Sequence, residues 1–225
     1  MALGSSAPRP VFGLERLLVS SAILFVTVAA LIASYDYFTL GGGGDGSAPK
    51  ERDARYYLGD IYLMRREPEA AIAQLREAVA AEPGDAYAWY LLGVISRDAG
   101  NVDDAIVALE RAVLVLPNYA EAYEELTLAY QQKGLPAETA YARGMRAYAQ
   151  RRYGEAIEEL EAASQMSPRL ASAYVGLGLA WEAQSQPSRA AAAYRQALQL
   201  EPDNSRARAG LVRLGQLTEP EVSTP

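Results

Sequence analysis

The chain of 225 residues carries a formal net charge of −7 and contains neither histidine nor cysteine. Without these side chains it can build neither a Ser-His-Asp or Cys-His catalytic centre nor an imidazole or thiolate metal site. We therefore expect no enzyme, cofactor, metal site or small-molecule substrate. Because the charge balance is acidic and no basic stripe stands out, we also expect no nucleic-acid partner.

Residues 17–35 form an uncharged, mostly apolar stretch that follows Arg16 and precedes Asp36. A helix of this length would span about 28 Å, close to the roughly 30 Å hydrocarbon core of a bilayer. A cleaved signal peptide is the alternative. Its apolar region would be shorter, about 7–15 residues, and would end in an A-x-A-like site, and no clear site of this kind is present. We predict an uncleaved transmembrane helix over 17–38, preceded by a short segment over 1–16.

The charges that flank this segment predict its orientation. Arg9 and Arg16 lie on its N-terminal side, whereas Asp36 and Asp45 follow it. Basic residues stay on the cytoplasmic side of a membrane helix, so the N-terminus is expected in the cytoplasm. Alanine is abundant and arginine outnumbers lysine by 19 to 2, which suggests a bacterial source. The sequence therefore predicts a single-pass protein of the bacterial inner membrane, with its larger part in the periplasm.

Small side chains recur at intervals of four within the predicted membrane helix, at Ala29 and Ala33 and at Ala30 and Ser34. Such spacing lets a neighbouring membrane helix approach closely, although ordinary lipid-facing composition gives the same pattern. A glycine-rich linker follows over 39–51. Linkers of this composition are flexible and short in reach, so the remainder of the chain would stay close to the membrane.

Blocks of 34 residues with the same landmarks recur through the rest of the chain, opening at Gly59, Gly93 and Gly178. In each block Ala follows at +12, an apolar residue at +16, Ala at +19 and Pro at +24. A fixed period of this length is typical of stacked supersecondary units. Small residues such as Gly93 and Ala105 would let the two helices of a unit cross closely, and Pro117 would end the second helix.

The block 171–204 carries the fullest set of landmarks: Tyr174, Leu177, Gly178, Trp181, Ala190, Tyr194, Ala197 and Pro202. This pattern resembles the tetratricopeptide repeat family, whose unit is a helix-turn-helix. The resemblance implies an all-α solenoid over 52–216 that binds other proteins. The expected units are 52–85, 86–119, 137–170 and 171–204, followed by a capping helix over 205–216 and a proline-rich tail over 217–225.

The capping helix is expected to close the array. Its Leu211 and Leu214 should pack inward, whereas Arg206 and Arg213 should point into solvent. A polar outer face of this kind keeps the last unit of a solenoid soluble.

The register of the repeats breaks once, at a half-repeat over 120–136. The block 137–170 begins after an interval of 17 residues, which is half a period. Residues 120–133 are expected to form one helix, and 137–150 could be either its partner or the opening helix of the next unit. We predict an irregular joint here that divides the array into two halves.

In this family the first helix of each unit lines a concave groove, so the resemblance implies which side chains could touch a partner. They combine apolar bodies with polar or charged ends and suit an extended or helical peptide: Tyr56, Asp60, Met64, Tyr87, Tyr90, Arg97, Tyr141, Met145 and Tyr148. The alternative is that several of these tyrosines belong to the core between repeats.

Two functions remain after these exclusions. The first is an accessory or assembly subunit of a larger membrane complex, respiratory, photosynthetic, secretory or of the cell envelope. Its partners would be the lipid bilayer and other subunits, contacted through the membrane helix and the repeats. The second is a membrane-tethered periplasmic chaperone or biogenesis factor that holds unfolded or peptide clients in the groove.

Overall fold

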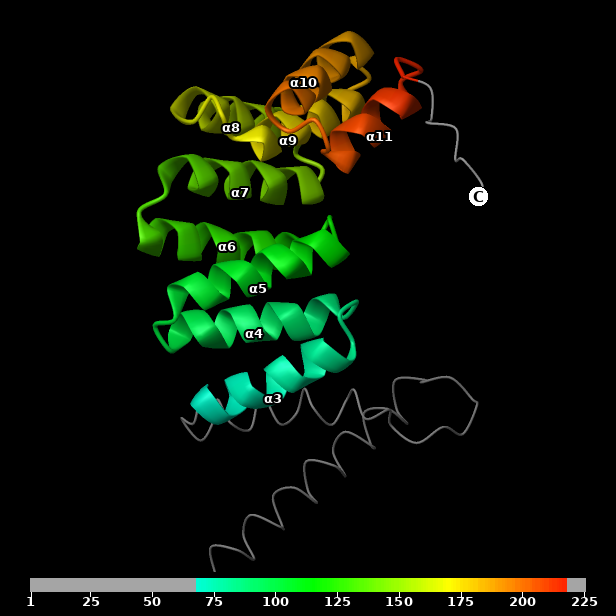
Figure 1. Cartoon of the computed structure of the whole chain (residues 1–225). Coiled ribbons are helices and arrows are strands. Elements are labelled where there is room, and N and C mark those ends of the chain that lie inside the picture. The colour runs from blue at the N-terminus through cyan, green and yellow to red at the C-terminus, as the bar shows by residue number, and fades with distance from the viewer. Residues whose placement is uncertain (1–67, 218–225) are drawn as a thin grey trace, which may run out of the picture. The chain divides into compact units, whose positions relative to one another are not determined.

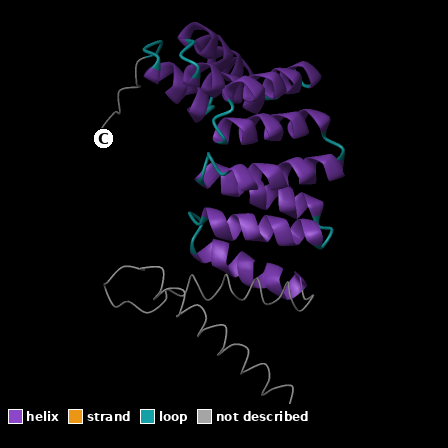
Figure 2. Cartoon of the chain, turned by 180° about the vertical axis from the view of Figure 1, so that it is seen from behind, coloured by secondary structure: helices purple, strands orange, loops and turns teal. Residues whose placement is uncertain are grey.

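The computed structural model describes residues 68–217, all within one compact unit that follows residue 58. This part of the chain forms nine helices and no strand (Figures 1 and 2). The helices are α3 Pro68–Ala81, α4 Ala86–Asp98, α5 Val102–Val115, α6 Ala120–Lys133, α7 Pro136–Ala149, α8 Tyr153–Met166, α9 Ala171–Ala183, α10 Pro187–Leu200 and α11 Ser205–Arg213.

The predicted membrane helix over 17–38, the linker over 39–51 and the first helix of the block 52–85 lie outside the described residues. Between residues 68 and 217, no helix combines the length and the apolar character needed to cross a bilayer.

Neighbouring helices cross where a glycine faces a large side chain. A Cβ atom added to Gly144 of α7 would lie 2.6 Å from Cγ of Leu160 on α8, closer than carbon atoms can approach. Gly93 of α4 meets Leu109 of α5 in the same way. Glycine is therefore needed at both positions for the backbones to come together, which confirms the close crossing predicted at Gly93.

The helix ends follow from local sequence. The Asp85 carboxylate accepts hydrogen bonds from the backbone N–H groups of Tyr87 and Ala88, at 3.0 and 3.1 Å, and thereby starts α4. Pro136 and Pro187 open α7 and α10. At the first turn of a helix the missing proline N–H would have had no partner within the helix.

The connection between α6 and α7 lies at the predicted half-repeat. It consists of Gly134 and Leu135, and Gly134 adopts the left-handed conformation with a φ of 73°. α7 packs on α6 and also on α8 (Figure 1). The two roles that the sequence left open for this helix are therefore both filled, because α7 is the second helix of one pair and the first helix of the next.

The hydrophobic core continues through this joint. One cluster of buried side chains extends from Ile106 on α5 through Leu126 on α6 and Met145 on α7 to Ala180 on α9. The prediction that the joint divides the array into two halves is therefore wrong for the core, because α7 buries side chains toward the helices on both of its sides.

Candidate functional site

The predicted groove face of α7 carries Tyr141, Met145 and Tyr148. Met145 is only 3% exposed and belongs to the core cluster shared with α5 and α6. Tyr141 and Tyr148 are half-buried and pack against the same cluster. For Met145 the structure favours the alternative of an inter-repeat core residue, and the two tyrosines lie at the edge of that core.

A side chain of α11 reaches the end of α5, although the two helices are far apart in sequence. The Arg206 guanidinium donates hydrogen bonds to the backbone carbonyls of Val113 and Leu114, at 3.4 and 3.5 Å. These carbonyls form the negative end of the α5 dipole, and α5 has no basic residue in its own last turn. The prediction that Arg206 points into solvent is therefore wrong, because this side chain caps a distant helix.

Arg206 borders two cavities of about 620 Å³ each. One, the loop cavity, is lined by the α5–α6 turn, α7, α9 and α11: Pro117, Asn118, Met145, Tyr148, Leu179, Glu182, Ala183, Arg206, Ala209 and Arg213. The other, the α5 cavity, is lined mainly by α5, α6 and α7: Val107, Glu110, Arg111, Val113, Leu114, Leu126, Tyr130, Glu138, Tyr141, Leu170, Ser172 and Arg206. The predicted groove residues of α7 therefore border these cavities, Met145 and Tyr148 the loop cavity and Tyr141 the α5 cavity.

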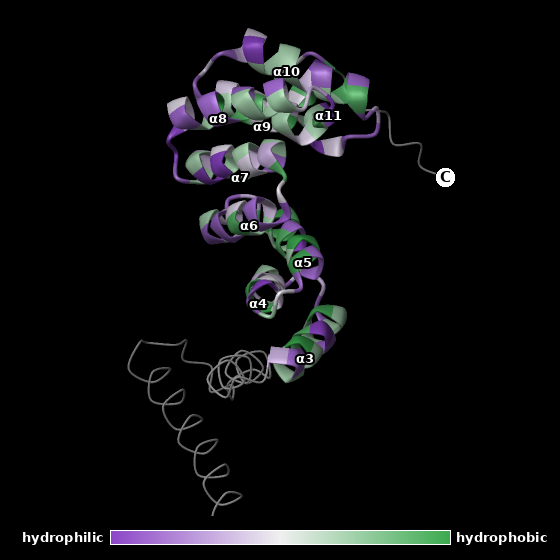
Figure 3. Ribbon diagram, turned by 90° about the vertical axis from the view of Figure 1, so that its left-hand side faces the viewer, coloured by the Kyte–Doolittle hydropathy of each residue, from purple (hydrophilic) through white to green (hydrophobic). Residues whose placement is uncertain are grey.

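The wall that α5 contributes to the α5 cavity is apolar and exposed. Val107 and Leu114 are 57% and 54% exposed, and they lie two helical turns apart on one side of α5. Figure 3 shows the strongly hydrophobic character of this helix. The Tyr130 hydroxyl donates a hydrogen bond of 2.7 Å to Glu110 at the edge of the cavity, and burial raises the pKa of Tyr130.

Arg206 is a half-buried cation that lines the α5 cavity beside the end of α5. Within residues 68–217 it forms no ion pair, and its hydrogen bonds are the two long ones to backbone carbonyls. A guanidinium has five N–H donors. Arg206 therefore has donors left for a further acceptor.

Tyr123 of α6 interacts with two residues that line the α5 cavity, Tyr141 and Arg206. It is fully buried, and its hydroxyl has no hydrogen-bond partner of regular geometry among the described residues. Burial and the neighbouring Tyr141 raise the pKa of Tyr123 well above its ordinary value, against the opposing effect of Arg206. The hydroxyl is therefore neutral at physiological pH.

The loop cavity is lined by a carboxylate, Glu182, that already accepts hydrogen bonds from within the array. Arg213 donates two hydrogen bonds to Glu182, at 3.0 and 2.9 Å, and the buried Tyr194 donates a third at 2.8 Å. These hydrogen bonds, from Arg213 above all, lower the pKa of Glu182. Arg213 was also predicted to point into solvent; it remains half-exposed but joins α11 to α9.

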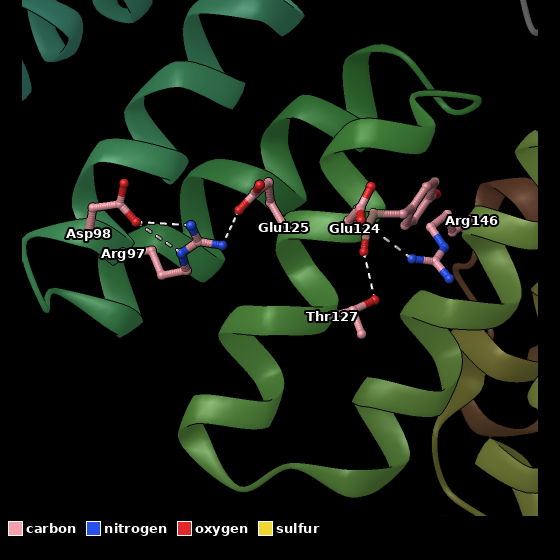
Figure 4. A network of polar contacts seen from close by, with 7 residues as sticks. Arg97, Asp98, Glu124, Glu125, Thr127 and Arg146 are labelled. Atoms are coloured by element: carbon pink, nitrogen blue, oxygen red, sulfur yellow. Dashed lines mark hydrogen bonds and ion pairs between the residues drawn. The ribbon is translucent and has the colours of Figure 1, made fainter. Parts of the chain in front are cut away.

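A polar network ties α6 to both neighbours (Figure 4). Arg97 of α4 pairs with Glu125 of α6 and, at 2.9 Å, with Asp98. Arg146 of α7 lies 3.8 Å from Glu124 of α6. Arg97 was predicted to line the groove, and the structure places it in an ion pair between two helices. Burial raises the pKa of Glu125 despite the opposing effect of Arg97.

The predicted groove tyrosines of α4 form an aromatic cluster. Tyr87 and Tyr90 stack with ring centroids 6.1 Å apart, and Tyr90 lies 5.1 Å from Tyr119, which precedes α6. Burial raises the pKa of both Tyr90 and Tyr119. Because Tyr119 lies in a turn, the helix-based prediction did not include it.

The remaining predicted site residues lie outside the described range: Tyr56, Asp60 and Met64 of the first block, and Ala29, Ala30, Ala33 and Ser34 of the membrane segment. Between residues 68 and 217 no group of three acidic, histidine or cysteine side chains is placed to hold a metal ion.

The sequence prediction missed the part of the site that α5 provides. The family pattern directs attention to the first helix of each unit, whereas α5 is a second helix. The buried residues of α5, which the family pattern does predict, end with Ala112 and Val113. A signal was nevertheless present, because Val107 and Leu114 are apolar residues on the side of α5 that otherwise carries Glu110 and Arg111.

Comparison with known proteins places these observations in a family. The model of the tetratricopeptide repeat matches residues 28–86, 62–123 and 141–205. The first match begins upstream of the predicted array, and residues 124–140, which contain the α6–α7 joint, lie between the second and third. No curated protein matches significantly.

Solved structures with similar folds include three repeat proteins. MamA shares 27% identity over 68% of this chain and 75% of its own, with a TM-score of 0.36. PilW, a type IV pilus biogenesis factor, shares 15% over 75% and 88%, with a TM-score of 0.37. YrrB, described as having an unusual peptide-binding site, shares 17% over 69% and 89%, with a TM-score of 0.36. From the matches to the family model, which cover more than half of its length, the chain belongs to the tetratricopeptide repeat family of protein-interaction scaffolds.

Proposed function

We propose that this chain is a non-catalytic accessory or assembly subunit of a membrane protein complex. In this proposal the segment 17–38 anchors the chain in a bacterial inner membrane, and the repeats dock on the extramembrane part of one partner in the periplasm. The observation that carries the proposal is that α7 packs on α6 as well as on α8, which buries Met145, a residue of its predicted groove face.

A groove face that is partly buried suits one defined partner better than many unfolded clients. A holding chaperone needs a long, accessible apolar surface that adapts to different chains. Here Met145 is buried, and α7, α9 and α11 border the loop cavity together with the α5–α6 turn. Apolar side chains are exposed on α5 and directly after it, at Val107, Leu114, Val115 and Leu116.

The membrane anchor is the second part of the proposal. The uncharged stretch 17–35 and the two arginines before it support a helix with its N-terminus in the cytoplasm. Fusions of alkaline phosphatase or green fluorescent protein to the C-terminus test this orientation, because only the phosphatase is active in the periplasm and only the fluorescent protein in the cytoplasm. A fluorescent, phosphatase-inactive pair would contradict it.

The function is tested by extracting the protein from its own membranes in a mild detergent and measuring the native size and composition by mass spectrometry. We expect one large complex in which this chain and a few other subunits have fixed stoichiometry. A small free species with many substoichiometric partners would contradict the subunit proposal and favour the chaperone alternative.

A further inference from the structure

The α5 cavity has the features of a protein-docking site rather than of a packing defect. Its volume, about 620 Å³, lies within the usual range for binding pockets. Val107 and Leu114 remain more than half exposed at its wall. Exposed apolar residues gathered beside a cavity mark interaction surfaces more often than isolated ones do.

The α5 wall has the geometry of a helix-packing face. Val107, Glu110, Arg111 and Leu114 all line the cavity, and their spacing of three and four residues places them on one side of α5. A second helix laid along this side would bury Val107 and Leu114 by ridge-into-groove packing.

The charges around the cavity define the partner further. Arg206 and Arg111 supply two positive charges, and neither forms an ion pair within the described residues. Glu110 and Glu138 also line the cavity. Glu110 already accepts a hydrogen bond from Tyr130, and Glu138 would repel a run of acidic residues. One carboxylate, placed at Arg206, is therefore the charge that fits.

We propose that the α5 cavity binds an amphipathic helix of the partner protein, with an apolar stripe along Val107 and Leu114 and a single Asp or Glu side chain paired with Arg206. This inference rests on the proposed function, because it specifies the partner chemistry of the same array. The partner carboxylate accepts the N–H donors of Arg206 that the α5 carbonyls leave unused.

The proposal is tested with stapled, fluorescein-labelled helical peptides that carry a leucine stripe and differ at one central position, which is Glu, Gln or Lys. Binding to the full chain in mild detergent is measured by fluorescence polarisation. A charge-assisted hydrogen bond in a half-buried site favours the Glu peptide over the Gln peptide by about tenfold, and the Lys peptide binds more weakly still.

Matched variants separate the site from the rest of the array. Arg206→Gln should abolish the preference for Glu over Gln, whereas Arg206→Lys should retain part of it. Arg208→Gln, on the same helix but outside both cavities, should leave it unchanged. Val107→Asp should weaken every peptide about tenfold or more, and Leu128→Asp, an exposed apolar position on α6 outside the α5 cavity, should not.

Because Arg206 also caps α5, each variant is checked for folding by thermal circular dichroism. If Arg206→Gln unfolds, peptide binding to Arg206→Lys and Val107→Asp still tests the proposed site. Equal affinity for the Glu and Lys peptides, equal loss in Val107→Asp and Leu128→Asp, or no peptide binding at all would overturn the inference. A stoichiometric native complex isolated in the same study would leave the subunit proposal intact, so the two failures are distinguishable.

Discussion

The pairs α9–α10 and α6–α7 show two ways in which one chain joins successive helices. In the first pair Gly178 lies against one edge of the Tyr194 ring, and Gly210 of α11 lies against the other edge. In the second pair α6 contains no glycine, and tyrosines of α6 and α7 belong to the core or pack against it. The regular joint is defined by close steric fit at glycine, and the half-repeat joint by aromatic packing.

This difference has a consequence for the groove. α7 packs on both α6 and α8, so Met145 is buried in the core and Tyr141 lies at the edge of the core. The half-repeat therefore replaces part of the predicted groove face of α7 with internal packing.

The largest expected effect tests the steric fit of the regular joint. Gly178→Ala places a methyl group inside the contact distance of the rigid Tyr194 ring, and overpacking of this kind costs about 1–3 kcal/mol. Gly154→Ala is the control, because a Cβ at that helical position meets nothing within 4 Å; it should be neutral or stabilise by up to about 1 kcal/mol. Urea unfolding of the full chain in detergent measures both. Equal effects would mean that the close crossing is not tight.

Substituting the two fully buried tyrosines, one at each joint, tests the next difference between the joints. Tyr194→Phe removes a hydrogen bond to Glu182 and should destabilise by about 1 kcal/mol. Tyr123→Phe removes a hydroxyl without a partner of regular geometry and should be neutral or stabilising, by up to about 1 kcal/mol. Thermal unfolding midpoints of the two variants should therefore move in different directions. A clear loss in Tyr123→Phe would show that its hydroxyl is satisfied after all.

Much of the fold could be predicted from the sequence, because the repeat landmarks are local. Gly93 indicates a close helix crossing and Pro117 indicates a helix end, each within a few turns of its own position. The helical array follows because these landmarks repeat along the chain. The position of the half-repeat was also visible in the spacing. Its effect on the core was not, since the roles of α7 depend on which faces α5 and α6 bury after the slip.

The candidate site was less accessible to sequence reasoning for the same reason. Arg206 has the pattern of a solvent-facing residue on a capping helix, and nothing local indicates that it meets carbonyls 93 and 92 residues earlier in the chain. Such a contact depends on how the helices between α5 and α11 turn as they stack. Pairing over this separation leaves no periodic signal in a single sequence.

The turns between helices offer a smaller test of the same comparison. Gly134 at the half-repeat joint and Ser185 in the α9–α10 connection both have a positive φ, of 73° and 59°. Gly134→Ala should therefore cost about 1 kcal/mol, since only glycine adopts this conformation without strain. Ser185→Gly should relieve strain and be neutral or slightly stabilising. Chemical unfolding of both variants measures the difference, and equal losses would mean that the turns do not set the stability of either joint.

The smallest expected effect is a difference in pH dependence between the two joints. The pKa of Glu182 is held below its ordinary value of 4.5, chiefly by Arg213, so its contribution to stability is complete above pH 4.5 and is lost as the pH falls through the lowered pKa. The pKa of Glu125 is raised above 4.5 by burial, so protonation favours the folded state as the pH falls through that raised value.

Unfolding midpoints measured from neutral pH down to about pH 3 distinguish the two carboxylates. Glu182→Gln should flatten the loss of stability on the acid side of pH 4.5, because the titrating group is gone. Glu125→Gln should instead remove a gain in stability that occurs on the alkaline side of pH 4.5, because the pKa of Glu125 is raised above 4.5. The variant Glu158→Gln, at an exposed position on α8, controls for net charge. If all three variants shift the acid limb alike, the pH dependence reflects total charge, and the opposite environments of α6 and α9 do not decide it.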